Sequence, residues 1–405
     1  MRIGMMADLY RPHISGVTNY IDLTREVLTS WGHEVFIFTF GEPQPDDDDY
    51  VIRSPGLPLR FASSGLYLNV RYTPEARRAL QAMDIVHVHH PFLSGRLALR
   101  YAKPVNIPIV FTNHTRYDLY MRAYLPLVPE ALGDMALRAY LPRFCREIDL
   151  TIAPSRGVLK MLRDLGVDAD IRVIPNGVDL TAFTQPVQPV AREQWGIGPE
   201  HVVVMYVGRL GPEKNLPFLL RAFWGMAQVY PQAHLVLVGD GPERENLQDR
   251  VQHMRLTDRV HFAGMVPYED VPRYLAAADI FATASDTEVH PLSVIEAMAS
   301  GLPVVGVRSP GVGEVVEHNR TGLLVEKDVA AFASALGRLV GDGALRRRLG
   351  EQARQAASAF DIRHTTRALV SEYERLIRQH RQHQVPWWRR WWTRWWHSED
   401  VPLLF

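Results

Sequence analysis

Short apolar segments alternate with longer helical ones along this chain, and the alternation starts twice. Five segments of the first half have the length and apolar character of buried strands: residues 2–7, 34–40, 84–89, 108–113 and 150–153. A helical period over residues 17–30 separates the first two, and turn or helix signals follow the others. This order is typical of parallel strands joined by crossover helices, with helices on both faces of the sheet.

The same order begins again after residues 180–199, which hold three prolines and show little periodicity. We interpret this segment as a linker. Five further strand-like segments follow, at residues 201–207, 233–238, 259–263, 280–284 and 303–307, with a helical period over 216–230. The sequence therefore predicts an α/β protein of two doubly wound, Rossmann-like domains, 1–182 and 183–360. Ligands bind beyond the carboxyl ends of the strands in such sheets, so two facing domains would form a cleft suited to two substrates.

The overall composition excludes several classes of protein. Lys+Arg and Asp+Glu both total 45, so a net basic field for nucleic acid is absent. Cys145 is the single cysteine, which excludes an intrachain disulfide and fits a reducing cytoplasm. The segment from Met1 to Asp8 does not have the pattern of a signal peptide, and no run of about 18 apolar residues predicts a membrane span.

The segment Gly-Arg-Leu-Gly-Pro-Glu-Lys-Asn at 208–215 follows a predicted strand and opens a predicted helix. Arg209 and Lys214 place two cations near a helix N-terminus, where backbone N–H groups and the helix dipole also attract anions. Arginine can bind phosphate oxygens through two donors, and lysine acts as a point charge. We predict a diphosphate site here; the alternative is a solvated loop that starts a helix. The segment lacks the P-loop pattern.

Two carboxylates, Glu288 and Glu296, flank the start of another predicted helix. Pro291 suits the first helical position, which places Glu288 just before the helix and Glu296 on its second turn. A carboxylate accepts hydrogen bonds from sugar or ribose hydroxyls, and the unpaired N–H groups of Leu292 and Ser293 suit a sugar or phosphate oxygen. The alternative is a capping acid and an ordinary helical glutamate.

Histidines and glycines stand at other strand ends. His114 ends the strand at 108–113 and could hydrogen-bond a sugar hydroxyl or steady a reacting centre, although a lone histidine there is more often structural. Gly16, after the first strand, lets backbone approach a ligand closely. His87, His89 and His90 have the composition of a metal site, but strand alternation puts only the first two on one face. Without a nearby acid or cysteine pattern we favour core and loop roles.

The acidic run at 46–49 is interpreted as a solvated loop, because adjacent carboxylates in a flexible loop repel and lack a fixed geometry. We therefore predict no metal site.

Taken together, these segments resemble the family 4 retaining glycosyltransferases of GT-B fold. The matching stretches are residues 15–17, 32–35, 113–115, 175–179, 207–215, 239–242 and 288–303. Their order and spacing cover residues 1 to about 360. The resemblance implies transfer of a hexose from a nucleotide diphosphate sugar with retention of anomeric configuration, through front-face attack and without a metal or other cofactor.

The resemblance also assigns roles to residues. Glu288 and His114 contact the transferred sugar as the catalytic pair, from opposite domains. The donor-binding set is Gly16, Arg209, Lys214, His290, Leu292, Ser293 and Glu296, with the Arg/Lys pair on the diphosphate and Glu296 on the ribose. The first domain would bind the acceptor and the second the donor, and a helix at 361–382 would pack back on the first.

Two positions depart from the family pattern. Ser15 stands where a second glycine is usual, and His290-Pro291 replaces the common Phe-Gly. Pro291 removes one backbone donor that could face the sugar. These departures leave the identity of the donor open.

The stretch from His114 to Tyr120 looks like that of diacylglycerol glucosyltransferases, which implies Tyr117, Asp118 and Tyr120 as acceptor-binding residues. The predicted reaction is transfer of glucose from UDP-glucose to a membrane lipid such as diacylglycerol. One alternative is transfer of mannose from GDP-mannose to phosphatidylinositol, another lipid or a soluble sugar. A non-catalytic membrane-bound scaffold is a third interpretation, and the presence of Arg209, Lys214, Glu288 and Glu296 argues against it.

Six of the nine tryptophans lie between Trp387 and Trp396, in a tail at 385–405. On a helix they would share an arc of about 180°, with arginines on the other side. A tryptophan face beside an arginine face suits an interfacial helix on an anionic membrane; the alternative is packing on the protein or a partner subunit. We therefore predict a cytoplasmic protein attached peripherally to the cytoplasmic face of the membrane.

Overall fold

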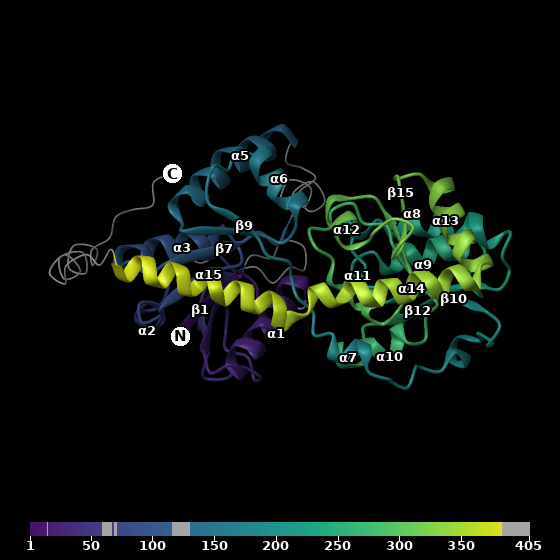
Figure 1. Cartoon of the computed structure of the whole chain (residues 1–405), viewed down its shortest axis with the longest axis horizontal. Coiled ribbons are helices and arrows are strands. Elements are labelled where there is room, and N and C mark those ends of the chain that lie inside the picture. Colours follow the sequence, from purple (N-terminus) through teal and green to yellow (C-terminus); the bar gives the residue numbers. More distant parts are fainter. Residues whose placement is uncertain (14, 59–66, 69–70, 116–129, 383–405) are drawn as a thin grey trace.

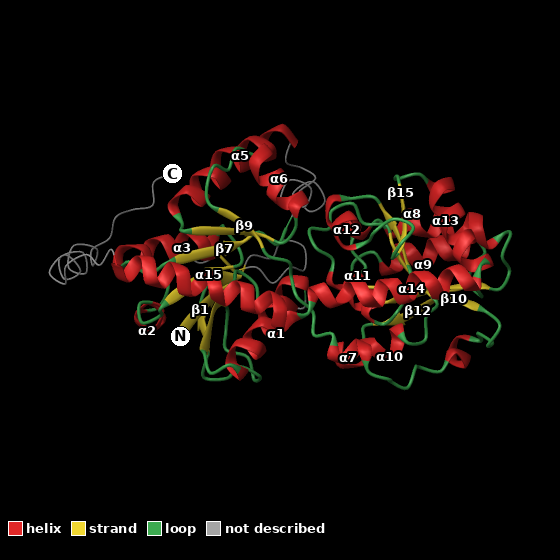
Figure 2. Cartoon of the chain, viewed as in Figure 1, coloured by secondary structure: helices red, strands yellow, loops and turns green. Residues whose placement is uncertain are grey.

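The computed structural model describes residues 1–13, 15–58, 67–68, 71–115 and 130–382, and it divides into two lobes that lie side by side (Figure 1). Each lobe holds one parallel sheet with helices on both faces (Figure 2). The predicted α/β architecture of two doubly wound domains is therefore confirmed. None of the helices in these residues combines the length and apolar character that a bilayer crossing requires.

The first lobe contains a seven-stranded sheet in the order β3-β2-β1-β6-β7-β8-β9. Its strands are β1 (Arg2–Met6), β2 (Glu34–Phe40), β3 (Val51–Ser54), β6 (Ile85–Val88), β7 (Ile109–Thr112), β8 (Leu150–Ala153) and β9 (Ile171–Val173). Its helices are α1 (Gly16–Ser30), α2 (Pro74–Leu80), α3 (Leu93–Tyr101), α5 (Glu130–Glu147), α6 (Arg156–Asp164) and the 3-10 helix η1 (Lys103–Val105). A short antiparallel pair, β4 (Leu57–Pro58) and β5 (Tyr67–Leu68), stands apart from the sheet.

The second lobe contains a six-stranded sheet in the order β12-β11-β10-β13-β14-β15. Its strands are β10 (Val202–Val207), β11 (Ala233–Val238), β12 (Val260–Gly264), β13 (Ile280–Thr283), β14 (Val304–Val307) and β15 (Gly322–Val325). Its α-helices are α7 (Thr181–Thr184), α8 (Leu216–Ala227), α9 (Arg244–His253), α10 (Val271–Leu275), α11 (Leu292–Ala299), α12 (Pro310–Val315), α13 (Val329–Gly341) and α14 (Gly343–Ala357). The 3-10 helices are η2 (Arg192–Trp195), η3 (Pro212–Lys214), η4 (Tyr268–Asp270) and η5 (Ser358–Phe360).

Alternation along the central strands builds two cores in each lobe. In β10, Val204 and Tyr206 face one apolar cluster, whereas Val203 and Met205 face another on the opposite side of the sheet. Because side chains on both faces of the sheet are removed from water, every position of β10 suits an apolar residue, and the strand is a continuous apolar run. Residues 180–199 pack on this lobe, where Phe183 and Ile197 are buried in the second of these clusters.

The last described helix, α15 (Ile362–Gln382), returns to the first lobe and runs along it (Figure 1). Its buried Leu369 and Tyr373 belong to the same apolar cluster as Ile3 of β1 and Leu28 of α1. The two chain crossings between the lobes are joined, because the N–H of Val178 donates to the carbonyl of Phe360 at 2.9 Å.

The sheet orders place a topological switch point in each lobe. From β1 the chain moves to β2 on one side and later to β6 on the other, and from β10 it moves to β11 and later to β13. Loops at the carboxyl ends of strands on either side of a switch point diverge and leave room for a ligand. A ligand site is therefore expected at the residues that follow β1, β6, β10 and β13.

Candidate active site

Two hydrogen bonds join the first lobe to the second. Ser155, after β8, donates its hydroxyl to the carbonyl of Val289 at 3.1 Å. The N–H of Gly157 donates to the carboxylate of Glu314 on α12 at 3.1 Å. Burial and the positive charge of Arg209, which belongs to the other lobe, both lower the pKa of His13. The loops after β1 and β10 therefore lie within electrostatic reach of each other.

The loop that carries Arg209 is shaped by backbone contacts. Gly208 has φ of +151° and Gly239 has φ of +130°, conformations that suit glycine. A Cβ atom on Gly239 would lie 2.0 Å from the carbonyl oxygen of Gly208, so the two loops touch through their main chains. The N–H of Leu210 donates to the carbonyl of Asp240 at 2.9 Å, and the hydroxyl of Tyr206 donates to the carbonyl of Arg209 at 2.9 Å. The loops after β10 and β11 thus fix each other.

Lys214 ends η3 and is directed at the loop after β13. The hydroxyl of Ser285 donates to the carbonyl of Glu213 at 3.0 Å, and the side-chain amide of Asn215 donates to the carbonyl of Ala284 at 3.3 Å. Lys214 Nζ lies 2.6 Å from Glu288 Oε1. Burial disfavours the charged ammonium, but the Glu288 carboxylate outweighs this effect, so the pKa of Lys214 is raised. Two residues predicted for different parts of the donor are therefore paired in this structure.

The segment between Glu288 and α11 is packed against both lobes. A Cβ atom on Gly311 would lie 2.1 Å from the carbonyl oxygen of Glu288, so α12 approaches this segment through backbone. His290 is buried, and its ring meets that of Phe360 edge-on at 5.2 Å. Burial lowers the pKa of His290 to about 3, so the ring is neutral. The structure thus holds His290 beside the crossing between the lobes.

Helix α11 begins one residue later than the sequence predicts. Pro291 is the N-cap and not the first helical residue, because its ψ of 108° is extended although its φ of −76° suits either position. No side chain caps this helix end, and Leu292 and Ser293 are partly exposed. Their N–H groups lie in the first turn, which has no intrahelical partners.

Glu296 lies on the second turn of α11 and is only 4% exposed. It accepts a hydrogen bond from the hydroxyl of Tyr268 at 2.9 Å. Burial raises the pKa of Glu296 to about 7, and the Tyr268 hydrogen bond acts in the opposite direction. Tyr268, on η4, is a site neighbour that the sequence analysis missed, and no pattern links two residues 28 positions apart.

On the first lobe, His114 follows β7 and lies beside two residues from other elements. Its Nε2 is 3.0 Å from Nδ1 of His89, which follows β6. Its ring centroid is 4.9 Å from that of Tyr20, one turn after Gly16 on α1. Burial lowers the pKa of His114 well below its usual range. The strand ends therefore bring Gly16, His89 and His114 to one part of the lobe.

Ser15, the departure from the family pattern, is the N-cap of α1. Its side chain accepts from the N–H of Thr18, and the Thr18 side chain accepts from the N–H of Ser15, which is a capping box. Gly16 is exposed, and an added Cβ atom would meet nothing within 4 Å. Folding of the unliganded chain therefore does not require glycine at this position.

The remaining candidates divide into three groups. His87 is buried and bonded to Thr112 and Tyr373, and His90 accepts from the N–H of Asp8, so both have partners within the fold. Within the described ranges no three His, Cys, Asp or Glu side chains form a metal-binding group. The predicted acceptor residues Tyr117, Asp118 and Tyr120 and the tail from Trp387 to Trp396 lie outside the described residues.

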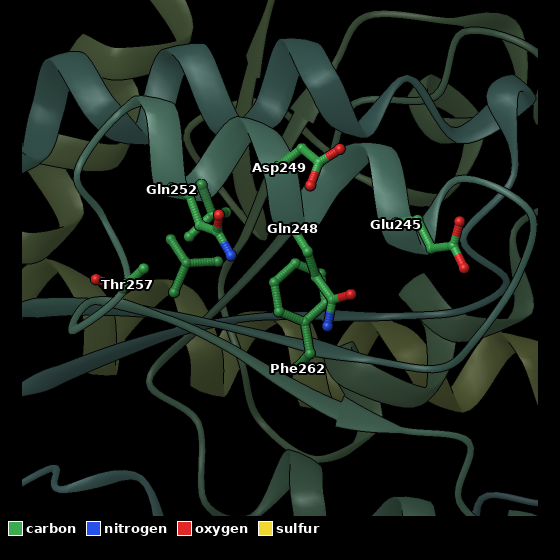
Figure 3. Close-up of a pocket in the computed structure, with 8 residues that line it drawn as sticks. Glu245, Gln248, Asp249, Gln252, Thr257 and Phe262 are labelled. Atoms are coloured by element: carbon green, nitrogen blue, oxygen red, sulfur yellow. The ribbon is translucent and has the colours of Figure 1, made fainter.

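A pocket lies elsewhere, between α9 and β12 on the second lobe (Figure 3). Its lining includes Glu245, Asp249 and Phe262, and it contains none of the predicted site residues. We do not assign it to the site.

Two family models match consecutive halves of the chain. The model for Glycosyltransferase Family 4 matches residues 14–182, and that for Glycosyl transferases group 1 matches residues 187–356. An alpha-monoglucosyldiacylglycerol synthase of Streptococcus pneumoniae is 31% identical over 346 residues, which are 82% of this chain and 77% of the relative. The chain belongs to glycosyltransferase family 4.

Further comparisons agree with the fold and class of this family 4 glycosyltransferase. An alpha-monoglucosyldiacylglycerol synthase of Acholeplasma laidlawii is 30% identical over 81% of this chain and 85% of its own length. Sucrose-phosphate synthase from Thermosynechococcus elongatus has a TM-score of 0.75 and 26% identity over 93% of this chain and 99% of its own. Anabaena Alr3699/HepE, in complex with UDP-glucose, has a TM-score of 0.75 and 22% identity over 92% and 99%. The predicted GT-B fold and the predicted enzyme class are confirmed.

In this family 4 glycosyltransferase, the predicted donor-side residues gather at the carboxyl ends of β10 and β13. Arg209 and Lys214 are on the loop after β10, and Glu288 reaches Lys214 from the loop after β13. His114 and Gly16 lie on the other lobe, at the ends of β7 and β1. The arrangement offers cations, a carboxylate and helix N–H groups from one lobe and an imidazole from the other.

Proposed function

We propose that this glycosyltransferase transfers glucose from UDP-glucose to a membrane lipid such as diacylglycerol, with retention of configuration. The observation that carries the proposal is the similarity to two enzymes named alpha-monoglucosyldiacylglycerol synthase, which extends over 82% and 81% of the chain and so includes both lobes. Retention with an α-configured donor such as UDP-glucose gives an α-linked product, the linkage in that name.

The donor diphosphate is proposed to lie against Arg209 and Lys214. Lys214 has three N–H donors, so it can keep its bond to Glu288 and still donate to a phosphate oxygen. Together with the N-terminus of α11, these cations would stabilise the charge that develops on the leaving diphosphate. We therefore propose that the reaction needs no divalent metal or other cofactor.

The sugar and ribose are proposed to lie along α11. Glu288 would accept hydrogen bonds from the transferred sugar, and Glu296 from the ribose hydroxyls. The first-turn N–H groups of Leu292 and Ser293 would donate to sugar or phosphate oxygens. His290 completes this donor-binding set from its buried position beside Phe360.

The first lobe is proposed to bind the acceptor and to contact the donor from the opposite side. His114 would hydrogen-bond the transferred sugar, and the exposed backbone at Gly16 would approach the phosphates. Tyr117, Asp118 and Tyr120 are proposed to contact the acceptor. The tail from Trp387 to Trp396 is proposed to hold the protein on the anionic cytoplasmic face of the membrane.

Retention is proposed to occur by front-face attack. The acceptor hydroxyl oxygen forms a bond to the anomeric carbon while the bond from that carbon to the diphosphate oxygen breaks, and the hydroxyl proton passes to the leaving phosphate. No covalent glycosyl enzyme forms in this scheme.

Transfer assays on the purified full chain test the proposal. We expect radiolabelled glucose to pass from UDP-glucose to diacylglycerol in anionic vesicles, with α linkage and with equal rates in excess chelator. Preferred transfer from GDP-mannose, or transfer to phosphatidylinositol or a soluble sugar, would favour the mannosyltransferase alternative. Loss of turnover with the chelator would contradict the role of the Arg/Lys pair in place of a metal.

A further inference from the structure

The His89–His114 pair leaves one proton position to be assigned. The two rings are nearly parallel, at 21° and 5.2 Å between centroids, and His89 Nδ1 lies 3.0 Å from His114 Nε2. Burial lowers the pKa of both histidines well below the usual range, so both rings are neutral. A neutral imidazole carries one N–H. One ring therefore donates to the other, and the choice determines which nitrogen of His114 carries its proton.

The opposite nitrogen of His89 decides the direction. His89 Nε2 is buried and has no hydrogen-bond partner among the residues that the structure describes. If His114 donated to His89 Nδ1, the proton of His89 would lie on Nε2 as a buried N–H without an acceptor, an arrangement that is rare in folded proteins. If His89 donates, Nε2 holds only an unpaired acceptor, which is tolerated more often. The second arrangement is favoured.

The surroundings of His89 hold its ring in this orientation. The His87 ring lies 4.2 Å away on one side, and the Tyr20 ring lies 5.9 Å away. His87 is itself fixed at both nitrogens, by Thr112 Oγ1 at 2.7 Å and by the hydroxyl of Tyr373 on α15 at 2.5 Å. Helix α15 thus holds the His87 ring, against which the His89 ring packs.

We propose that His89 is a positioning residue that donates its Nδ1–H to His114 Nε2 and thereby fixes His114 as the tautomer that carries its proton on Nδ1. No other hydrogen bond to the His114 ring is found in the described part of the chain, and His114 is partly exposed. Its Nδ1–H is then the group available to donate to an oxygen of the transferred sugar. This inference rests on the proposed function for the sugar contact, but the tautomer itself does not.

The tautomer can be measured without turnover. Long-range ¹⁵N–¹H spectra of histidine-labelled wild-type protein distinguish a protonated Nδ1 from a protonated Nε2, and loss of one signal set in His114→Gln assigns it. We expect His114 to be protonated on Nδ1. Protonation on Nε2 would overturn the proposal, whether or not the protein transfers glucose.

Two substitutions of His89 test its effect on transfer. The amide nitrogen of asparagine lies near the place of imidazole Nδ1, whereas that of glutamine lies near Nε2, so H89N keeps the donor to His114 and H89Q loses it. We expect H89N to keep kcat within about threefold of wild type and H89Q to lose about tenfold or more, the effect of one lost hydrogen bond to the reacting sugar. The Kd for UDP should be unchanged in both variants, because UDP lacks the transferred sugar that His114 is proposed to contact.

The H89N and H89Q variants test the positioning role separately from the tautomer. Equal kcat values in folded H89N and H89Q, checked by thermal unfolding, would overturn the positioning role. If either variant fails to fold, the wild-type tautomer still decides the proposal. If wild type transfers no sugar from any donor while His114 is protonated on Nδ1, the proposed function fails and the positioning of His114 by His89 stands.

Discussion

Lys214 and Glu288 form an ion pair across the switch point of the second lobe, with 2.6 Å between Nζ and Oε1. Their side chains are 23% and 19% exposed, so the pair is shielded from much of the solvent. Surface pairs contribute little to stability, but removal of one partner from a shielded pair leaves the other charge poorly compensated. Each partner therefore restrains the position of the other, and Glu288 favours the charged form of Lys214, before any ligand binds.

Replacement of Glu288 by glutamine should reduce kcat by about 100-fold or more, the range seen when a group that stabilises the transition state is removed. The substitution removes the charge but keeps the shape of the side chain and an amide oxygen that can accept from Lys214, so the fold should persist. Steady-state transfer assays and circular dichroism check both expectations. Glu317→Gln is the matched control, because Glu317 is exposed and pairs only with Arg320 on its own turn among the contacts described. Near-normal turnover of Glu288→Gln would remove Glu288 from the mechanism.

Replacement of Lys214 by alanine should weaken UDP binding by about tenfold or more, because the proposed charge-assisted bond to phosphate would be lost. Calorimetric titration with UDP measures this change. Lys327→Ala provides the comparison, since Lys327 also pairs with a carboxylate, Asp286, at 2.7 Å but on the exposed surface. Equal UDP affinity in the two variants would contradict a phosphate role for Lys214.

Parts of this site follow from the sequence, and other parts do not. The six residues of β10 are all buried, so an uninterrupted apolar run identifies the strand. Parallel topology then sends the loops after such strands to one edge of the sheet, which is why Lys214 and Glu288 could be predicted near one site. Their direct pairing could not be predicted, because it depends on how two loops 74 positions apart in the chain are shaped.

Local signals also mislead at two elements. Pro142 lies inside α5, where a proline normally argues against a helix. Its neighbours Leu141 and Phe144 are buried in the core of the first lobe, and this packing compensates for the lost hydrogen bond. Pro291 shows the opposite case: its φ suits a helix, but its extended ψ delays the helix by one residue.

Glu296 should make the protein less stable as the pH rises. Its folded-state pKa of about 7 lies above the ordinary value of 4.5, so the folded state holds the proton more tightly than the unfolded state. The stabilising contribution of protonated Glu296 to the free energy of unfolding is therefore fully present below pH 4.5 and is lost as the pH rises to about 7. It amounts to about 1.4 kcal/mol for each pKa unit between the folded and unfolded states. Glu296→Gln should flatten this part of the profile, as measured by denaturant unfolding between pH 4 and 8. A slope that the substitution leaves unchanged would show that Glu296 has the same pKa in the folded and unfolded states.

Replacement of Gly16 by alanine should have opposite effects on stability and on donor binding. The site is exposed and open around the added methyl group, and a glycine-to-alanine change at a compatible position stabilises a protein by about 0.4–1 kcal/mol. UDP affinity should fall, because the methyl group would stand between the backbone and a phosphate. Gly313→Ala on α12 is the control, as its added Cβ atom also meets nothing within 4 Å. Thermal unfolding with and without UDP measures both effects. If UDP raises the Tm of Gly16→Ala as much as it raises that of Gly313→Ala, the phosphates lie away from Gly16.

Deletion of residues 385–405 should release the protein from anionic vesicles in a flotation assay, because in the proposed anchor the six tryptophans would supply interfacial apolar area and the arginines would meet anionic lipid. Arg389→Glu combined with Arg390→Glu and Arg394→Glu should abolish the preference for anionic over zwitterionic vesicles while leaving all six tryptophans in place. Binding of the wild type should also weaken with added salt, since arginine contacts to a charged surface are screened over about 10 Å at 0.1 M. If the truncated chain floats as well as the full chain, the tail does not anchor the protein. If truncation instead changes the mass measured by light scattering without lipid, the tryptophans pack between subunits.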